Sequence, residues 1–130
     1  MTQASILGSS KLVAFVPVTD AARALAFYEG VLGLRLVADQ KPFALVFGAH
    51  GTMLRVTLVG AFKAQSFTVL GWEVESIEET VQGLTAAGVV FERFPGMNDA
   101  HPLAIWAAPS GAQIAWFKDP DGNLLSVTQF

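Results

Sequence analysis

Residues 115–129 read AWFKDPDGNLLSVTQ, two β-prone runs that flank a short turn. Pro120 presets one backbone angle of the turn, and the carboxylates of Asp119 and Asp121 can accept hydrogen bonds from nearby backbone amides. Gly122 supplies the positive φ that a tight reversal needs. The segment therefore predicts a β-hairpin, and the rest of the chain can be divided into elements by working outward from it.

The order strand, helix and then strands occurs twice along the chain. Asp20 precedes the first helical pattern as an N-cap, and Ser76 with Glu79 forms a capping box before the second. Gly33 and Gly88 follow the two helices, as C-terminal glycines do. In the first half we expect strands at 11–19, 34–38, 43–47 and 52–59 and a helix at 21–32; in the second, a strand at 67–75, a helix from 77 to 88, and strands at 89–94, 103–108, 113–117 and 124–129.

This repetition predicts an α+β fold made of two tandem βαβββ repeats. The repeat halves cover about residues 11–60 and 66–130, within a single domain that spans residues 1–130. Each unit gives a mostly antiparallel sheet with its helix on one face. Two such units side by side predict curved sheets around a shared cleft.

Composition excludes several classes of protein. Of 130 residues, 52% are hydrophobic and only 15% are charged, with a net charge of −3 and no cysteine. Zero cysteines exclude a disulfide scaffold and cysteine-ligated metal, and the acidic balance argues against nucleic acid as a partner. The apolar runs are too short to span a membrane, and residues 1–10 lack a basic leader, so we expect no membrane partner and a cytoplasmic location. The apolar excess predicts a subunit interface or an apolar pocket.

Three segments resemble the vicinal oxygen chelate superfamily, which includes glyoxalases, bleomycin resistance proteins and ring-cleaving dioxygenases. They are VPVTDAARALAFYEGVLGLRL at 16–36, GWEVESIEETVQGLTAAGVVFE at 71–92, and the hairpin at 115–129. The resemblance implies paired βαβββ units and, in most family enzymes, a divalent metal held by side chains from four strands.

The positions that the resemblance assigns to metal ligands do not carry ligand residues. They fall on Val13, Val69 and Ser126, with Arg55 or Thr57 on the remaining strand. Valine cannot bind a metal, serine is a poor ligand, and arginine repels a cation. We therefore expect no metal and no other cofactor, which disfavours the usual metal-dependent activities of the family. A displaced metal site has candidate donors, but no characteristic ligand spacing, in His50, His101, Asp99, Glu73 and Glu75.

Strand alternation predicts which side chains line the cleft. The predicted ligand-binding residues are Val13, Phe15, Arg55, Thr57, Val69, Gly71, Glu73, Leu124 and Ser126. Phe15, Trp72, Trp106 and Trp116 are candidates to stack on a flat ligand, although aromatic residues are equally typical of a core or a dimer interface.

Glu73 and Arg55 are the two candidate catalytic residues. A carboxylate in an apolar cleft can acquire a raised pKa and serve as an acid or a base. An Arg55 partner would instead keep Glu73 ionised in a structural ion pair, which is the arrangement we expect because an unpaired buried charge is costly.

Three functions are compatible with these patterns. The first is a homodimeric binding protein that holds a small apolar or planar molecule in a metal-free cleft. The second is a glyoxalase-like or dioxygenase-like lyase or isomerase that uses Glu73 with Arg55, or a metal bound by non-standard ligands. The third is a dimeric scaffold whose cleft is filled by Phe and Trp side chains.

Overall fold

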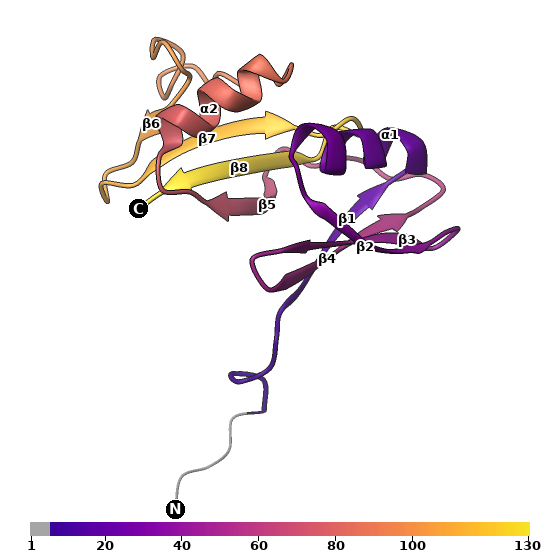
Figure 1. Cartoon of the computed structure of the whole chain (residues 1–130). Coiled ribbons are helices and arrows are strands. Elements are labelled where there is room, and N and C mark those ends of the chain that lie inside the picture. Colours follow the sequence, from indigo (N-terminus) through magenta and orange to yellow (C-terminus); the bar gives the residue numbers. More distant parts are fainter. Residues whose placement is uncertain (1–5) are drawn as a thin grey trace, which may run out of the picture.

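The computed structural model describes residues 6–130; residues 1–5, half of the segment examined for a leader, lie outside the described part. Two open four-stranded sheets and two helices form an α+β fold, as predicted (Figure 1). The first sheet has the order β1 (Val13–Val18), β4 (Thr52–Leu58), β3 (Ala44–Ala49), β2 (Arg35–Gln40), and the second β5 (Thr68–Glu73), β8 (Leu124–Gln129), β7 (Gln113–Lys118), β6 (Trp106–Ala107).

The two βαβββ units have the same topology. In each sheet the first strand pairs in parallel with the last strand of its unit, and the other pairings are antiparallel. The edge strands β1 and β5 contact each other, so the two sheets lie side by side. Helices α1 (Ala21–Leu25) and α2 (Ile77–Ala86) lie on the same side of the sheets (Figure 1). We call the opposite, helix-free side of each sheet its open face.

The first helix consists of an α-helical part followed by a π-helical part. The Asp20 carboxylate accepts from the amide of Arg23 at 2.9 Å, which caps the helix as expected. After Leu25 the helix continues as a π-helix over Ala26–Val31 and ends at Gly33, whose φ is +75°. The helix expected at 21–32 is thus present, with a local widening that the sequence did not indicate.

The second unit differs from the prediction between α2 and β7. Residues 89–94 form only an isolated bridge between Phe91 and Phe117, and the strand expected at 103–108 is reduced to Trp106–Ala107. Side chains explain the difference, because Asn98 and Arg93 take up loop backbone groups that a longer strand would need for pairing. We call residues 94–105 the aromatic loop, since it begins at Phe94 and leads into Trp106.

One hydrophobic core joins the two units. The ring of Phe117 in the second unit packs against Phe27 of the first and against Trp72 and Phe91. The hairpin turn at 119–123 reaches across as well, because the side-chain amide of Asn123 donates to the carbonyl of Pro17 at 2.8 Å. Over the described residues, helices of the length and apolar character needed to cross a bilayer are absent.

Candidate functional site: the open faces of the two sheets

The predicted lining residues of the first unit lie together on the open face of its sheet. Val13 and Phe15 on β1 are 42% and 61% exposed, whereas Val16 and Val18 are fully buried on the helix side. The parallel register places Phe15 beside Arg55. Thr57 follows on the same face, as strand alternation requires, and the role of these residues in ligand binding stays a prediction.

The second unit carries the remaining predicted residues. Val69 is 37% exposed at a bulge of β5, and Gly71 and Glu73 follow as exposed positions. Gly71 pairs with Ser126, whose hydroxyl occupies the space where a side chain at position 71 would extend. Ser126 and Leu124 are only 7% and 5% exposed, so they form the floor of this face and not its rim.

The expected ion pair between Arg55 and Glu73 is absent. The guanidinium of Arg55 donates instead to Gln40 Oε1 at 3.0 Å, across β3 within its own sheet. Over residues 6–130 the salt bridges do not include Glu73, which is exposed and lies beside Thr128 on the other sheet.

The positions assigned to metal ligands by the resemblance do not fit a divalent metal. Val13 and Val69 offer only carbon atoms, and Ser126 offers a single hydroxyl on a floor without a carboxylate beside it. Nor does the part of the chain that the structure describes bring three His, Asp or Glu side chains close enough to share an ion. The displaced candidates are scattered: His50 lies in the β3–β4 turn, whereas Asp99 and His101 lie in the aromatic loop.

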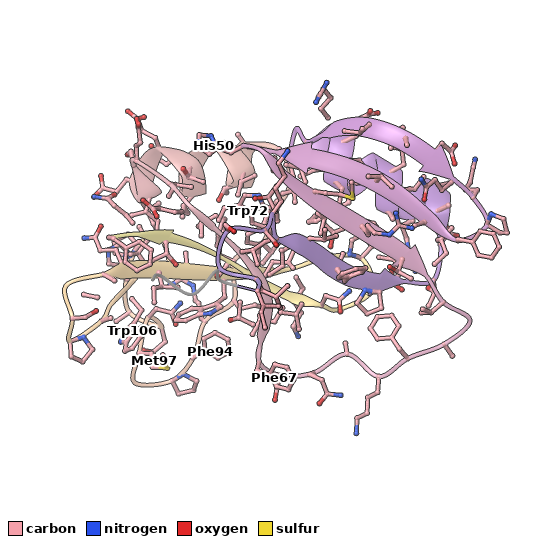
Figure 2. The ribbon with its side chains drawn as sticks, turned by 90° about the horizontal axis from the view of Figure 1, so that it is seen from below. His50, Phe67, Trp72, Phe94, Met97 and Trp106 are labelled. Atoms are coloured by element: carbon pink, nitrogen blue, oxygen red, sulfur yellow. The ribbon has the colours of Figure 1, made fainter. Side chains whose placement is uncertain are left out.

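An aromatic wall stands on the open face of the second sheet. It consists of Phe94, Trp106 and Trp116, with Trp116 in the middle at ring-centroid distances of 5.4 Å from Phe94 and 5.9 Å from Trp106. The indole N–H of Trp116 donates to the hydroxyl of Thr68 at 3.0 Å, which fixes the orientation of that ring. Figure 2 shows Phe94 and Trp106 gathered on one side of the molecule, far from His50.

Exposed apolar side chains extend this wall. Met97 in the aromatic loop is 42% exposed, and Phe67, just before β5, is 61% exposed (Figure 2). Sequence reasoning missed Phe67, Phe94 and Met97. Phe67 and Phe94 are the terminal residues of the strands expected at 67–75 and 89–94, and in the structure all three residues lie outside the regular strands. The signal in the sequence was that these apolar residues belong to the same unit as the tryptophans.

Trp72 does not belong to the wall. It lies on the helix side of β5 and stacks on Phe117 at 6.4 Å with an interplanar angle of 18°. The prediction that Trp72 could stack on a ligand in the cleft is therefore wrong, and the competing interpretation of a core residue holds. Alternation alone explains this outcome, since neighbouring residues of a strand point to opposite faces.

A shallow cavity of about 290 Å³ lies at the far end of the first sheet's open face. Arg35, Val37, Gly48, His50 and Met53 are among the residues that line it. The wall, which stands on the other sheet, offers apolar contact and ring stacking with few fixed polar groups, and this suits recognition of an apolar or planar molecule more than acid–base chemistry.

Comparison with known proteins agrees with the geometry. Residues 11–127 match the family model for the Glyoxalase/Bleomycin resistance protein/Dioxygenase superfamily. No match was found among curated proteins.

Solved structures of the same overall shape include a lactoylglutathione lyase from Agrobacterium tumefaciens, with a TM-score of 0.73, 19% identity, and 93% of each chain covered. Another is a member of the Glyoxalase/bleomycin resistance protein/dioxygenase superfamily from Sphaerobacter thermophilus, with a TM-score of 0.71, 24% identity, and coverage of 94% of this chain and 98% of that one. A glyoxalase/bleomycin resistance protein/dioxygenase from Alicyclobacillus acidocaldarius has a TM-score of 0.71, 17% identity, and coverage of 94% and 92%. At these identities the likeness shows the fold alone.

Proposed function

Because the chain belongs to the Glyoxalase/Bleomycin resistance protein/Dioxygenase superfamily, we propose that it binds a small apolar or planar molecule on its open sheet faces without a metal. The observation that carries this proposal is the aromatic wall of Phe94, Trp106 and Trp116. Flat rings gain dispersion and quadrupole interactions when they pack against such side chains. Beside the wall, Gly71 and the buried Ser126 keep the floor of the sheet low, which supports close approach of a flat ligand.

A coumarin titration tests this binding, because coumarin is planar, bicyclic and uncharged. We expect calorimetry to detect saturable binding, and Trp106→Ala to weaken it by roughly fivefold or more, since an aromatic contact is worth about 1 kcal/mol beyond its buried area. The matched control is Trp72→Phe on the helix side, which should leave the affinity unchanged. Absence of saturable binding up to millimolar coumarin, or an equal loss in both variants, would contradict the proposal.

The site would operate within a homodimer. Val13, Phe15 and Met53 expose 42–61% of their area on one open face, and a second copy of the chain would cover them. We expect sedimentation of the wild type as a dimer and a shift of Phe15→Glu toward monomer. Phe43→Glu is the control, because Phe43 is 73% exposed but precedes β3 in the β2–β3 turn. Sedimentation of the wild type as a monomer at micromolar concentration would contradict this assembly.

Binding without a metal has its own test. Val13, Val69 and Ser126 supply no set of donors, so dialysis against EDTA should leave both the melting temperature and coumarin affinity unchanged. Purified protein that carries stoichiometric zinc, nickel, manganese or iron, and loses coumarin binding when stripped, would overturn this part of the proposal.

The alternative of a lyase or isomerase that uses Glu73 has less support. Glu73 is exposed and Arg55 bonds to Gln40, so the pair that such a mechanism would combine is not assembled. A general base needs a partner that orients it and surroundings that tune its pKa.

A further inference from the structure

His101 holds the aromatic loop through an acceptor that exists only in the neutral ring. Its Nδ1 atom accepts from the backbone amide of Leu103 at 3.0 Å and from that of Ile105 at 3.3 Å. A nitrogen that accepts two hydrogen bonds carries no proton, so the ring is neutral with its hydrogen on Nε2. Protonation of Nδ1 would turn this acceptor into a donor that faces two other donors.

Between those two amides lies a residue in a costly conformation. Ala104 has a φ of +57°, in the left-handed region that a residue with a Cβ rarely adopts. Its amide donates to the carbonyl of His101 at 3.1 Å, and its own carbonyl accepts from the buried side chain of Asn98 at 2.6 Å. The bonds from Leu103 and Ile105 to His101 therefore help to fix a strained turn.

The strained turn leads directly into the aromatic wall. Trp106 follows Ile105, and β6 comprises only Trp106 and Ala107, which pair with Ile114 and Gln113. So short a strand gives Trp106 little pairing of its own. The position of the Trp106 ring against Trp116 thus depends on the conformation of residues 101–105.

The charges around His101 do not offset an added proton. The guanidinium of Arg93 donates to the carbonyls of His101 at 2.6 Å and Asp99 at 3.1 Å, which brings a cation close to the histidine. The Asp99 carboxylate accepts from the amide of Gly96. Nearby, Glu92 pairs with Lys118, and the α2 residues beside Leu103 are the uncharged Val81 and Thr85.

We propose that His101 is a positioning residue for the aromatic wall, and that its protonation loosens the loop and weakens binding of planar ligands. This inference rests on the proposed function, because it assigns a pH response to the same site. Histidine in general is the side chain whose charge changes between about pH 5 and 8, so the test is made across that interval.

Two measurements on the full chain separate this inference from the proposed function. In the ligand-free protein, NMR follows the indole N–H of Trp106 from about pH 8 to about pH 5, and we expect its resonance to shift with the titration of His101. Calorimetry then measures the dissociation constant of coumarin, a ligand that does not titrate in this interval. The constant should rise roughly tenfold from about pH 8 to about pH 5, because the two hydrogen bonds to His101 are lost. If coumarin fails to bind at any pH, the proposed function fails, while the NMR measurement still tests the role of His101.

Variants distinguish positioning from a general effect on stability. In His101→Asn the side-chain oxygen can accept from the same amides but does not titrate. Its coumarin affinity should therefore stay, across the whole pH interval, near the affinity that the wild type has at about pH 8. His101→Phe removes the acceptor, so this variant should bind coumarin weakly at both ends of the pH interval. His50→Asn is the control, since His50 lies in the β3–β4 turn of the other sheet, and it should keep the full pH response.

Three results would overturn the inference. One is a Trp106 resonance that does not respond to pH. Another is a pH response of coumarin affinity that persists in His101→Asn. The third is a pH response that disappears in His50→Asn.

Discussion

The hydroxyl of Tyr28 donates a hydrogen bond of 2.7 Å to Oδ2 of Asp119, and both residues are buried. Tyr28 belongs to the helix of the first unit and Asp119 begins the hairpin turn of the second. The Asp119 carboxylate also accepts from the amides of Asp121 and Asn123 and from the Asn123 side chain. The turn that marks the fold in the sequence therefore also connects the two units through a buried hydrogen bond.

Removal of the Tyr28 hydroxyl should weaken this connection between the two units. We expect Tyr28→Phe to lower the free energy of unfolding by about 1–3 kcal/mol, because a buried hydrogen bond to a charged acceptor is lost. Urea denaturation measures the change. Thr19→Val is the comparison: it removes the exposed bond of 2.6 Å to Asp121 and should cost less than about 1 kcal/mol. Equal effects of the two variants would show that burial of the Tyr28 hydrogen bond adds nothing to the free energy of unfolding.

Tyr28 should also make the protein sensitive to alkali. Burial, and then the charge and hydrogen bond of Asp119, raise the pKa of the Tyr28 phenol well above its ordinary value near 10. Above about pH 10 the unfolded chain loses the phenol proton while the folded chain keeps it, so the stabilising contribution is complete below that pH and declines above it. The decline is about 1.4 kcal/mol per pH unit.

The comparison with Tyr28→Phe isolates this effect, since other groups titrate equally in both proteins. The stability difference between wild type and variant, measured in urea at about pH 8 and about pH 11, should shrink at the higher pH. Tyr28 is the only tyrosine of the chain, so ultraviolet absorbance reports its ionisation directly. Ionisation of Tyr28 near pH 10 in protein that is still folded would contradict the assignment.

Gly122 should resist substitution because of its backbone conformation. Its φ is +88°, and an added Cβ would lie 3.4 Å from the Cβ of Ala64. We expect Gly122→Ala to lower the free energy of unfolding by about 1–2 kcal/mol. Gly60→Ala is the matched control, since that glycine has open space around it and no left-handed φ. A Gly122→Ala variant as stable as Gly60→Ala would show that the turn adopts another geometry.

Asn98 should be essential to the aromatic loop. Only 1% of its surface is exposed, and its side chain accepts from the amide of Phe94 at 2.7 Å and donates to the carbonyls of Glu92 and Ala104. Asn98→Ala leaves these three backbone groups without that partner, which should cost about 2–4 kcal/mol in thermal or urea unfolding. Asn98→Asp keeps the acceptor but loses both donors, and we expect an intermediate loss near neutral pH. Full stability of Asn98→Ala would mean that the loop finds other partners.

The sequence allowed prediction of those features that follow from local chemistry. The capped helices, the hairpin at 115–129 and the open-face positions of Val13 and Phe15 follow from caps, turn residues and alternation. The same alternation assigns Trp72 to the helix side, opposite Glu73, where the structure has it.

Features that depend on distant pairing could not be predicted. Arg55 meets Gln40 only because β3 lies between their strands, and that register is not visible in a single sequence. The aromatic loop is similar, because its shape comes from side-chain bonds of Arg93, Asn98 and His101 to the backbone and not from a periodic pattern.

The parallel pairing of β1 with β4 and of β5 with β8 has a consequence for how the chain folds. Val13 must find Met53, and Glu73 must find Thr128, after all the intervening elements of each unit have been made. Closing such long loops before their contacts form is entropically unfavourable, so the rate of folding falls as sequence separation grows. We therefore expect refolding on the slow side of the range for small domains, in milliseconds to seconds, with the hairpin of β7 and β8 formed ahead of the parallel pairs.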